Sequence, residues 1–190
     1  MFSKLTLAIA KENLKQSPPF DPRYRKMCEE LLLDRGDFYE RDFYCLSNFS
    51  SFKLMWKGLT FDTSEHAYHW EKFNLDTAWH IHIKNTIHLG TMSAHQAFKL
   101  ANQVRDRRRP DWDDATSNGR PVKVNIMKSI LRAKLEQHEY VHQKLRQAYY
   151  NGLNLTERSW RDSFWGCGED GEGEDWMGGL WTEIAKEAFR

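Results

Sequence analysis

The sequence predicts a predominantly α-helical fold with a small antiparallel β element, an α+β class, in a single domain. Three observations support this. With 190 residues, the chain can bury a core without metal or disulfide cross-links. Alternating aromatic and polar residues, typical of strands, are concentrated in residues 38–62. After Asp62, most apolar residues recur at helical spacing.

We divide the chain into an N-terminal accessory arm, residues 1–36, and a main domain, residues 37–190. Within the arm, residues 1–16 and 27–33 have the pattern of two short helices, and a proline-rich stretch separates them. We find no internal repeat that would suggest a different division.

The main domain is expected to begin with a short sheet and to continue as helices. In FKLMWKGLTF, Lys57 and Gly58 predict the turn of a β-hairpin. Apolar periodicity predicts five helices, with a break near His138 in the fourth. Their expected ranges are 63–74, 76–88, 93–106, 122–150 and 179–189.

Composition excludes several classes of protein. A net charge of +1 argues against a surface built wholly for nucleic acid, although a local patch is compatible with it. Cys28, Cys45 and Cys167 are odd in number and widely spaced, which favours reduced thiols over a disulfide framework. The apolar run at 5–10 is too short for a signal sequence, and no segment is long enough to span a membrane. We therefore expect a cytoplasmic protein without membrane contact.

The segment TSEHAYHWEKF, residues 63–73, has an unusual distribution of polar residues. On a helix, Glu65, His69 and Lys72 fall within about 60° of one another. Aromatic side chains flank this polar group on both sides, the reverse of ordinary amphipathic patterning. Glu71 lies on the opposite side, where we expect it to face solvent. The flanking residues are Tyr68, Phe73, His66 and Trp70.

Structural explanations compete with a pocket at this helix. Asp62 and Glu65 fit a capping box, which would give Glu65 a role only in starting the helix. The Lys72 side chain could extend past the aromatic rings to solvent. His66 and His69 have metal-ligand spacing, but the sequence offers no third ligand nearby, so no metal is expected. The helix alone supports the pocket and the structural interpretation equally.

The glycine-rich stretch WGCGEDGEGEDWMGG, residues 165–179, contains a literal G-x-G-x-x-G. A dinucleotide site is excluded because no buried strand precedes it and its acidic residues would repel a pyrophosphate. The glycines allow close approach to a ligand or positive φ angles, and Trp165 offers a stacking surface for a base or sugar. A surface loop between two helices explains the same composition.

A basic cluster, Arg105, Arg107, Arg108 and Arg109, precedes Pro110. Such clusters are most often solvated helix ends. Arginine also binds phosphate oxygens in a bidentate manner, so these four are candidate phosphate-binding residues.

Several motifs, in order over roughly residues 38–190, resemble the NADAR family, also described as the YbiA-like domain. The motifs are FY (38–39), LSNF (46–49), G-x-x-F-x-T-S-E-H-A-Y (58–68), KF (72–73), LRAKLEQHE (131–139), LTERSWRDSFWGCG (155–168) and G-x-G-x-x-x-M-G (171–178). The resemblance implies a mainly helical fold and a hydrolase that cuts N-glycosidic bonds between a phosphorylated ribose and a nucleobase-like group. It implies two activities: cleavage of early riboflavin-pathway intermediates, and removal of ADP-ribose from guanine in nucleic acid, opposing DarT-type toxins.

The chain departs from the family pattern at three places. Asp175 stands where the family usually has Asn, which would change contacts to a ribose or phosphate. Ala101 and Asn102 replace a frequent Gly-Arg. The arm, residues 1–36, has no counterpart in the family.

The resemblance also assigns roles to residues. Lys72 would attack the anomeric carbon of a ring-opened sugar to form a Schiff base, and Glu65 would transfer protons. A competing mechanism has a carboxylate activate water directly. The implied substrate-binding residues are Asn48, His66, His69, Glu157, Asp162, Trp165, Gly166 and Asp175, of which Glu157 and Asp162 would bind ribose hydroxyls or only brace the loop.

The predicted function is removal of ADP-ribose from guanine in nucleic acid, because the arginine cluster suits a polyanionic substrate. The first alternative is an N-glycosidase for a small phosphoribosyl-nucleobase conjugate of riboflavin biosynthesis. The second is a module that binds ADP-ribose without cleaving it, and the third a metal-dependent hydrolase using His66 and His69. We expect no cofactor, and the sequence leaves the oligomeric state open.

Overall fold

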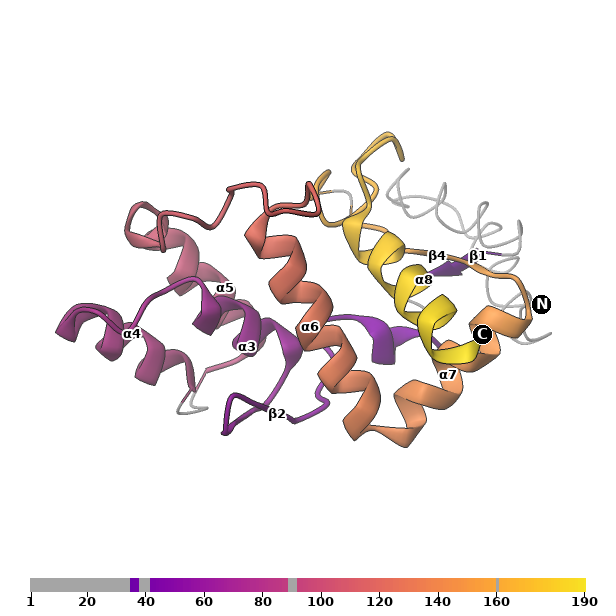
Figure 1. The fold of residues 1–190 in the computed structure, drawn as a ribbon, viewed down its shortest axis with the longest axis horizontal. Coiled ribbons are helices and arrows are strands. Elements are labelled where there is room, and N and C mark those ends of the chain that lie inside the picture. The colour runs from indigo at the N-terminus through magenta and orange to yellow at the C-terminus, as the bar shows by residue number, and fades with distance from the viewer. Residues whose placement is uncertain (1–34, 38–41, 89–91, 160) are drawn as a thin grey trace, which may run out of the picture. The chain divides into compact units, whose positions relative to one another are not determined.

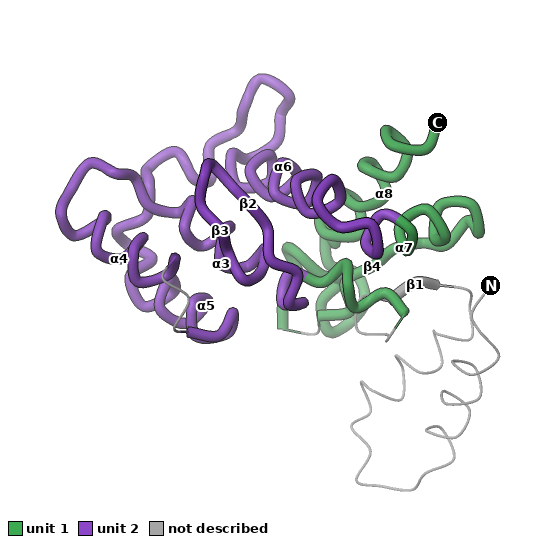
Figure 2. The backbone as a smooth tube through the Cα atoms, turned by 90° about the horizontal axis from the view of Figure 1, so that it is seen from below, with its two compact units in different colours: residues 1–47, 143–190 green, residues 48–142 purple. Residues whose placement is uncertain are grey.

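The structure, a computed structural model, describes residues 35–37, 42–88, 92–159 and 161–190. The chain forms two compact units, coloured separately in Figure 2. Unit 1 contains residues 1–47 and 143–190, and unit 2 contains residues 48–142. The helices expected in the arm, together with Cys28, lie outside the described residues.

Unit 2 contains the predicted β-hairpin. Strands β2 (Leu54–Trp56) and β3 (Leu59–Phe61) pair antiparallel. Lys57 and Gly58 connect them with φ angles of 49° and 80°, the left-handed conformation that a tight two-residue hairpin turn requires. The hairpin predicted from the Lys-Gly pair is therefore confirmed.

The described residues of unit 2 also contain four complete α-helices, and the shortest of these lies at the centre of the unit. Helix α3 (Ser64–Glu71) packs against α4 (Ala78–His88), α5 (Ala94–Gln103), α6 (Val122–Gln137) and strand β3 (Figure 1). Every residue of α3 is buried. A helix enclosed on all sides needs no solvated face, so its polar residues must find partners inside the protein.

The start of α3 differs from the predicted capping box. Thr63, not Asp62, is the N-cap, and its hydroxyl accepts a hydrogen bond from the backbone N–H of His66 at 3.3 Å. Glu65 is thus one position too early for the reciprocal contact of a capping box. Its backbone N–H instead donates to the carbonyl of Asn48 at 3.2 Å.

The break predicted near His138 is confirmed. Helix α6 ends at Gln137, His138 is extended (φ −132°, ψ 103°), and α7 (Glu139–Tyr150) follows. Hydrogen bonds to β2 explain the position of the break. The side-chain amide of Gln137 accepts from the Met55 N–H at 2.6 Å and donates to the Met55 carbonyl at 2.9 Å.

Unit 1 contains a pair of strands that the sequence analysis missed. Strand β1 (Arg35–Asp37) pairs in parallel with β4 (Asn154–Thr156), and α8 (Trp176–Phe189) packs on β4. The indole of Trp181 donates to the carbonyl of Leu46 at 3.0 Å, at the end of a short 3₁₀ helix, Tyr44–Leu46. Strand β1 spans the predicted boundary between the arm and the main domain, which lies after residue 36. The division into an arm and a domain stays a prediction.

Helix α8 begins at Trp176, three residues before its predicted start. Asp175 is its N-cap, with a left-handed backbone (φ 45°), and its carboxylate accepts from the Gly178 N–H at 3.2 Å. Gly178 lies inside the helix because a Cβ at this position would be 2.4 Å from the Leu155 carbonyl oxygen of β4. Gly178, which the sequence analysis places in the glycine-rich loop, therefore belongs to a helix and permits that helix to pack closely on a strand.

The architecture is predominantly helical with a small antiparallel sheet, as predicted. Cys45 and Cys167 are both buried. Among the described residues, no helix combines the length and the apolar character needed to cross a bilayer.

Candidate functional site

The polar face of α3 contains a buried acid–imidazole pair. The Nε2 atom of His69 lies 2.7 Å from Oε1 of Glu65, one helical turn away. The two residues are 1% and 6% exposed. Glu65 therefore has a specific side-chain partner inside the protein, and its carboxylate plays no part in a capping box.

Lys72 caps the C-terminal end of α3 and is half-buried. Its Nζ lies over two aromatic rings, 5.2 Å from the centroid of Tyr68 and 6.0 Å from that of Trp112. Burial lowers the pKa of Lys72 to about 8, and Glu65 only partly offsets this effect. A lysine with such a pKa has a substantial fraction of neutral, nucleophilic amine near neutral pH.

Other charges also act on Lys72. Arg108 and Lys123 lower its pKa and Asp113 raises it. Asp113 pairs with both cations, through Oδ1 with Lys123 at 3.0 Å and through Oδ2 with Arg108. The loop that carries Arg108 is tied to the helix end, because the backbone N–H of Arg109 donates to the Lys72 carbonyl at 2.7 Å.

His66 and Asn48 are held by contacts within unit 2. The Nδ1 of His66 is 2.9 Å from the Thr63 hydroxyl, and its Nε2 is 3.0 Å from the Met92 carbonyl. Both ring nitrogens of His66 thus bind the protein itself. Asn48 is 7% exposed, and its amide contacts the sulfur of Met127 at 3.3 Å.

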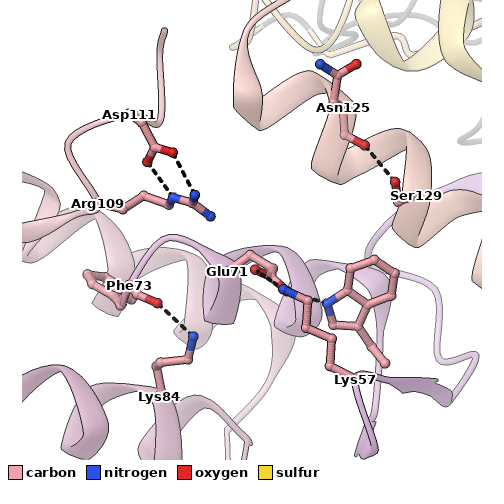
Figure 3. A network of polar contacts seen from close by, with 9 residues as sticks. Lys57, Glu71, Phe73, Lys84, Arg109, Asp111, Asn125 and Ser129 are labelled. Carbon is pink, nitrogen blue, oxygen red and sulfur yellow. Dashed lines mark hydrogen bonds and ion pairs between the residues drawn. The ribbon is translucent and has the colours of Figure 1, made fainter. Parts of the chain in front are cut away.

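Glu71 corrects our expectation of a solvated side chain opposite the polar face. It is 3% exposed, and its Oε1 accepts from the Trp56 indole at 2.6 Å and pairs with Lys57 Nζ at 2.8 Å (Figure 3). The prediction was wrong because α3 is central, so that the hairpin covers this side. The contacts of Glu71 serve to attach α3 to β2 and its turn.

Lys84 is a buried lysine that the sequence analysis did not single out. Its Nζ donates to the Phe73 carbonyl at 2.7 Å (Figure 3) and lies 3.4 Å from the ring centroid of Trp70. Burial lowers its pKa to about 8. Nothing in its spacing distinguishes Lys84 from an exposed lysine of an amphipathic helix, so only the tertiary structure identifies it.

Three of the four clustered arginines have partners within unit 2. Arg109 makes a bidentate pair with Asp111, at 2.6 and 2.7 Å (Figure 3). Arg108 pairs with Asp113, and the Arg107 guanidinium lies 4.9 Å from the ring centroid of Trp79. Arg105 is exposed.

The remaining predicted site residues lie in unit 1, around the glycine-rich loop. The Oδ1 of Asp162 accepts from the backbone N–H groups of Phe164 and Trp165, at 2.9 and 2.8 Å. Trp165 is half-buried and meets the Phe164 ring edge-on at 5.0 Å. Asp162 therefore shapes the turn that presents Trp165, an Asx turn in form.

Close approach explains the glycines and the aspartate of this loop. A Cβ on Gly166 would lie 2.7 Å from the Glu157 carbonyl oxygen, which also accepts from the Cys167 N–H at 2.9 Å. Asp175 accepts from the Glu157 N–H at 3.0 Å, and burial raises the pKa of its carboxyl. Asp and Asn are among the non-glycine residues that best tolerate the left-handed backbone of Asp175.

The structure thus gathers the predicted residues into two groups. Unit 2 contains Asn48, Glu65, His66, His69, Lys72 and the arginines, and unit 1 contains Glu157, Asp162, Trp165, Gly166 and Asp175. Trp112, which the sequence analysis did not identify, is 2% exposed and forms one wall beside Lys72. The signal available in the sequence was the position of Trp112, two residues after Pro110 and close to the arginine cluster.

Comparison with known proteins identifies the class. A family model for the NADAR domain matches residues 37–187. The chain is 30% identical over 154 residues to N-glycosidase YbiA of Escherichia coli, covering 81% of this chain and 82% of that protein. It is also 30% identical over 153 residues to a riboflavin biosynthesis protein of Vibrio vulnificus, covering 79% of this chain and 37% of that longer protein.

The fold agrees with the sequence comparison. The NMR structure of E. coli YbiA matches with a TM-score of 0.66 and 28% identity, over 81% of this chain and 84% of that one. The chain belongs to the NADAR family, as the sequence motifs predicted. The N-glycosidases named YbiA are among its relatives.

Proposed function

We propose that this protein is an N-glycosidase that separates a nucleobase nitrogen from the anomeric carbon of a phosphorylated or ADP-ribosylated ribose. Lys72 is the nucleophile and Glu65 the general acid–base group. One observation carries the proposal: an amine with a pKa of about 8 lies against Tyr68 and Trp112, on the helix that carries buried Glu65. A lowered pKa alone does not identify a nucleophile, because Lys84 shares it. The Lys84 Nζ, however, is bound to the Phe73 carbonyl, and it is Lys72 whose pKa the Glu65 carboxylate acts on first after burial.

The reaction proceeds through a covalent imine. Glu65 takes a proton from the Lys72 ammonium and delivers it to the ring oxygen as the ribose ring opens. The neutral Lys72 amine adds to C1 and gives up a proton to Glu65. Glu65 returns this proton to the base nitrogen as the bond between C1 and that nitrogen breaks. Water then adds to C1, the bond between C1 and Nζ breaks, and the free sugar aldehyde and the Lys72 amine are released. Glu65 transfers the protons.

The alternative mechanism, direct attack by water that a carboxylate activates, needs no amine of lowered pKa. It also leaves the aromatic setting of Lys72 without a chemical role. The imine mechanism accounts for both features, and we therefore favour it.

For the substrate, we propose ADP-ribosylated guanine in nucleic acid. Arg108 and Lys123 act electrostatically on Lys72, so positive charge surrounds the reacting amine. Asp113, which now pairs with both cations and is about half exposed, is a carboxylate that a substrate phosphate can replace. A diphosphate next to the ribose suits this arrangement.

A phosphoribosyl-aminouracil intermediate of riboflavin biosynthesis is the second candidate. The name of the Vibrio relative favours it. The contacts of two arginines also favour it, because Arg107 lies over the Trp79 ring and Arg109 pairs with Asp111. Fewer cations are then left to bind a polyanionic substrate than the sequence suggested. A single phosphate would need only Arg108 and Lys123.

Incubation of the purified protein with each substrate tests the proposal. Guanine-ADP-ribosylated DNA should release ADP-ribose and retain an unmodified guanine, and mass spectrometry detects both products. If the second candidate is correct, the aminouracil conjugate should release ribose phosphate instead. The variants Lys72→Met and Glu65→Gln should be inactive on the true substrate. Tight binding of ADP-ribose, without turnover of either conjugate, would instead identify a non-catalytic binding module.

A further inference from the structure

We propose that His69 is a positioning residue, a neutral imidazole that carries its proton on Nε2 and donates it to Glu65. This contact holds the Glu65 carboxylate in one orientation, in which it acts first as a base. The inference rests on the role proposed for Glu65. It replaces the expectation that His69 binds substrate.

The geometry leaves His69 little else to contact. The residue is 1% exposed, so it presents almost no surface to a substrate. Its ring meets Tyr68 of the same helix and Phe98 of α5 edge-on, with centroid distances of 5.5 and 5.8 Å. The Glu65 carboxylate, 2.7 Å from Nε2, is its polar partner among the described residues.

The unpartnered Nδ1 atom identifies the tautomer. Among the described residues, no group bonds to Nδ1. A proton there would be a buried donor without an acceptor, and the Nε2 lone pair would face a carboxylate that can only accept. A proton on Nε2 satisfies Glu65 and leaves on Nδ1 only an acceptor without a donor, which is the less costly arrangement.

The surroundings also keep the ring neutral. Burial lowers the pKa of His69 more strongly than Glu65 raises it, and Lys72 and His66 lower it further. These three groups are the charged or titratable neighbours that act on the ring, and all lie on or at the end of α3. From α5, the contact is the uncharged ring of Phe98. The pair is therefore a hydrogen bond from a neutral donor to a carboxylate.

This arrangement orders the proton transfers. A carboxylate that already accepts one hydrogen bond keeps further acceptor sites and has no proton of its own to give. Glu65 must take a proton from the Lys72 ammonium before it can give one to the ring oxygen. It must then take a second proton, from Nζ after the amine has added to C1, before it can give one to the leaving nitrogen.

NMR tests the tautomer without any substrate. In protein labelled with ¹⁵N-histidine, the two-bond ¹⁵N–¹H spectrum of His69 should show a neutral ring protonated on Nε2 throughout the range from pH 6 to 8. The variant Glu65→Gln should alter this signal and leave that of His66 in place. A doubly protonated ring at neutral pH, or a proton on Nδ1, would overturn the inference even if the protein is an N-glycosidase.

Kinetics test the consequence for catalysis. His69→Leu, which removes the donor, should lower kcat by roughly 10²-fold, the lower end of acid–base contributions. KM should change little. His69→Gln, whose amide reaches the position of Nε2, should restore most of the activity.

A control separates positioning from packing. His95, exposed on α5, stacks on the same Phe98 ring at 6.0 Å, and His95→Gln should leave kcat and its pH profile unchanged. Equal losses of kcat in His69→Leu and His69→Gln would mean that His69 only packs. If no conjugate is cleaved, the proposed function fails, and the NMR result still decides the tautomer.

Discussion

Glu65 and Glu71 show how the same residue type acquires two roles on one helix. Both are buried, but Glu65 pairs with the imidazole of His69, whereas Glu71 binds an indole and an ammonium group. In our proposal, the first pair positions the carboxylate that transfers protons, on the helix that ends at Lys72. The second attaches the helix to the hairpin. At the scale of single residues, the partner decides the role, and burial alone does not.

The first prediction concerns the pH dependence of the Lys72 reaction. Burial lowers the pKa of Lys72 to about 8, and only the neutral amine attacks carbon. The rate of imine formation should therefore rise about tenfold per pH unit below pH 8 and level off above it. Single-turnover measurements between pH 6 and 10 check this profile.

Lys84 provides the matched control, because burial lowers its pKa to about 8 as well. It binds the Phe73 carbonyl and has no chemical role in the proposal. Lys84→Met should keep the rise toward pH 8. If this variant loses the inflection, Lys84 and not Lys72 governs the pH dependence.

At the scale of elements, α3 depends on its attachment to the hairpin. In Glu71→Ala, the Trp56 indole loses its buried acceptor, so the free energy of unfolding should fall by about 1–3 kcal/mol. Urea denaturation measures the change. Lys53→Ala, which removes an exposed ion pair with Asp62, should cost less than about 1 kcal/mol. Equal costs for the two variants would contradict the role given to Glu71.

Helix α8 offers two adjacent glycines with opposite expected behaviour. In Gly178→Ala, the new methyl group would meet the Leu155 carbonyl, so the protein should lose about 1–3 kcal/mol of stability from overpacking. In Gly179→Ala, the methyl group meets nothing within 4 Å, and the protein should gain about 0.5–1 kcal/mol from helix propensity. Thermal or urea unfolding compares them; effects of the same sign would show that the helix does not pack on β4 as described.

At the scale of the whole molecule, local sequence signals predicted most elements. The Lys-Gly turn, the break at His138 and the main helices follow from residue type and apolar spacing. The parallel pair of β1 and β4 did not, because its strands are short and far apart in the sequence. The start of α8 was missed because Gly178 is needed for a tertiary contact with Leu155. The spacing of apolar residues along the sequence cannot reveal such a contact.

The candidate site was only partly predictable for the same reason. The clustering of Glu65, His69 and Lys72 on one helical face is a local property, and the spacing of these residues indicated it. The solvated face assigned to Glu71 was wrong because it depends on what covers the helix. The walls beside Lys72 include Trp112 from a distant loop, which no period within α3 could indicate.

The central claim is that Lys72 forms a covalent imine with the sugar. The most direct test is to incubate the protein with the conjugate that it cleaves in the presence of sodium borohydride, and then to analyse its peptides by mass spectrometry. We expect a reduced sugar adduct on Lys72 in the native protein, and neither adduct nor turnover in Lys72→Arg. Turnover without any adduct, together with activity that survives in Lys72→Arg, would contradict the claim and favour direct attack by water.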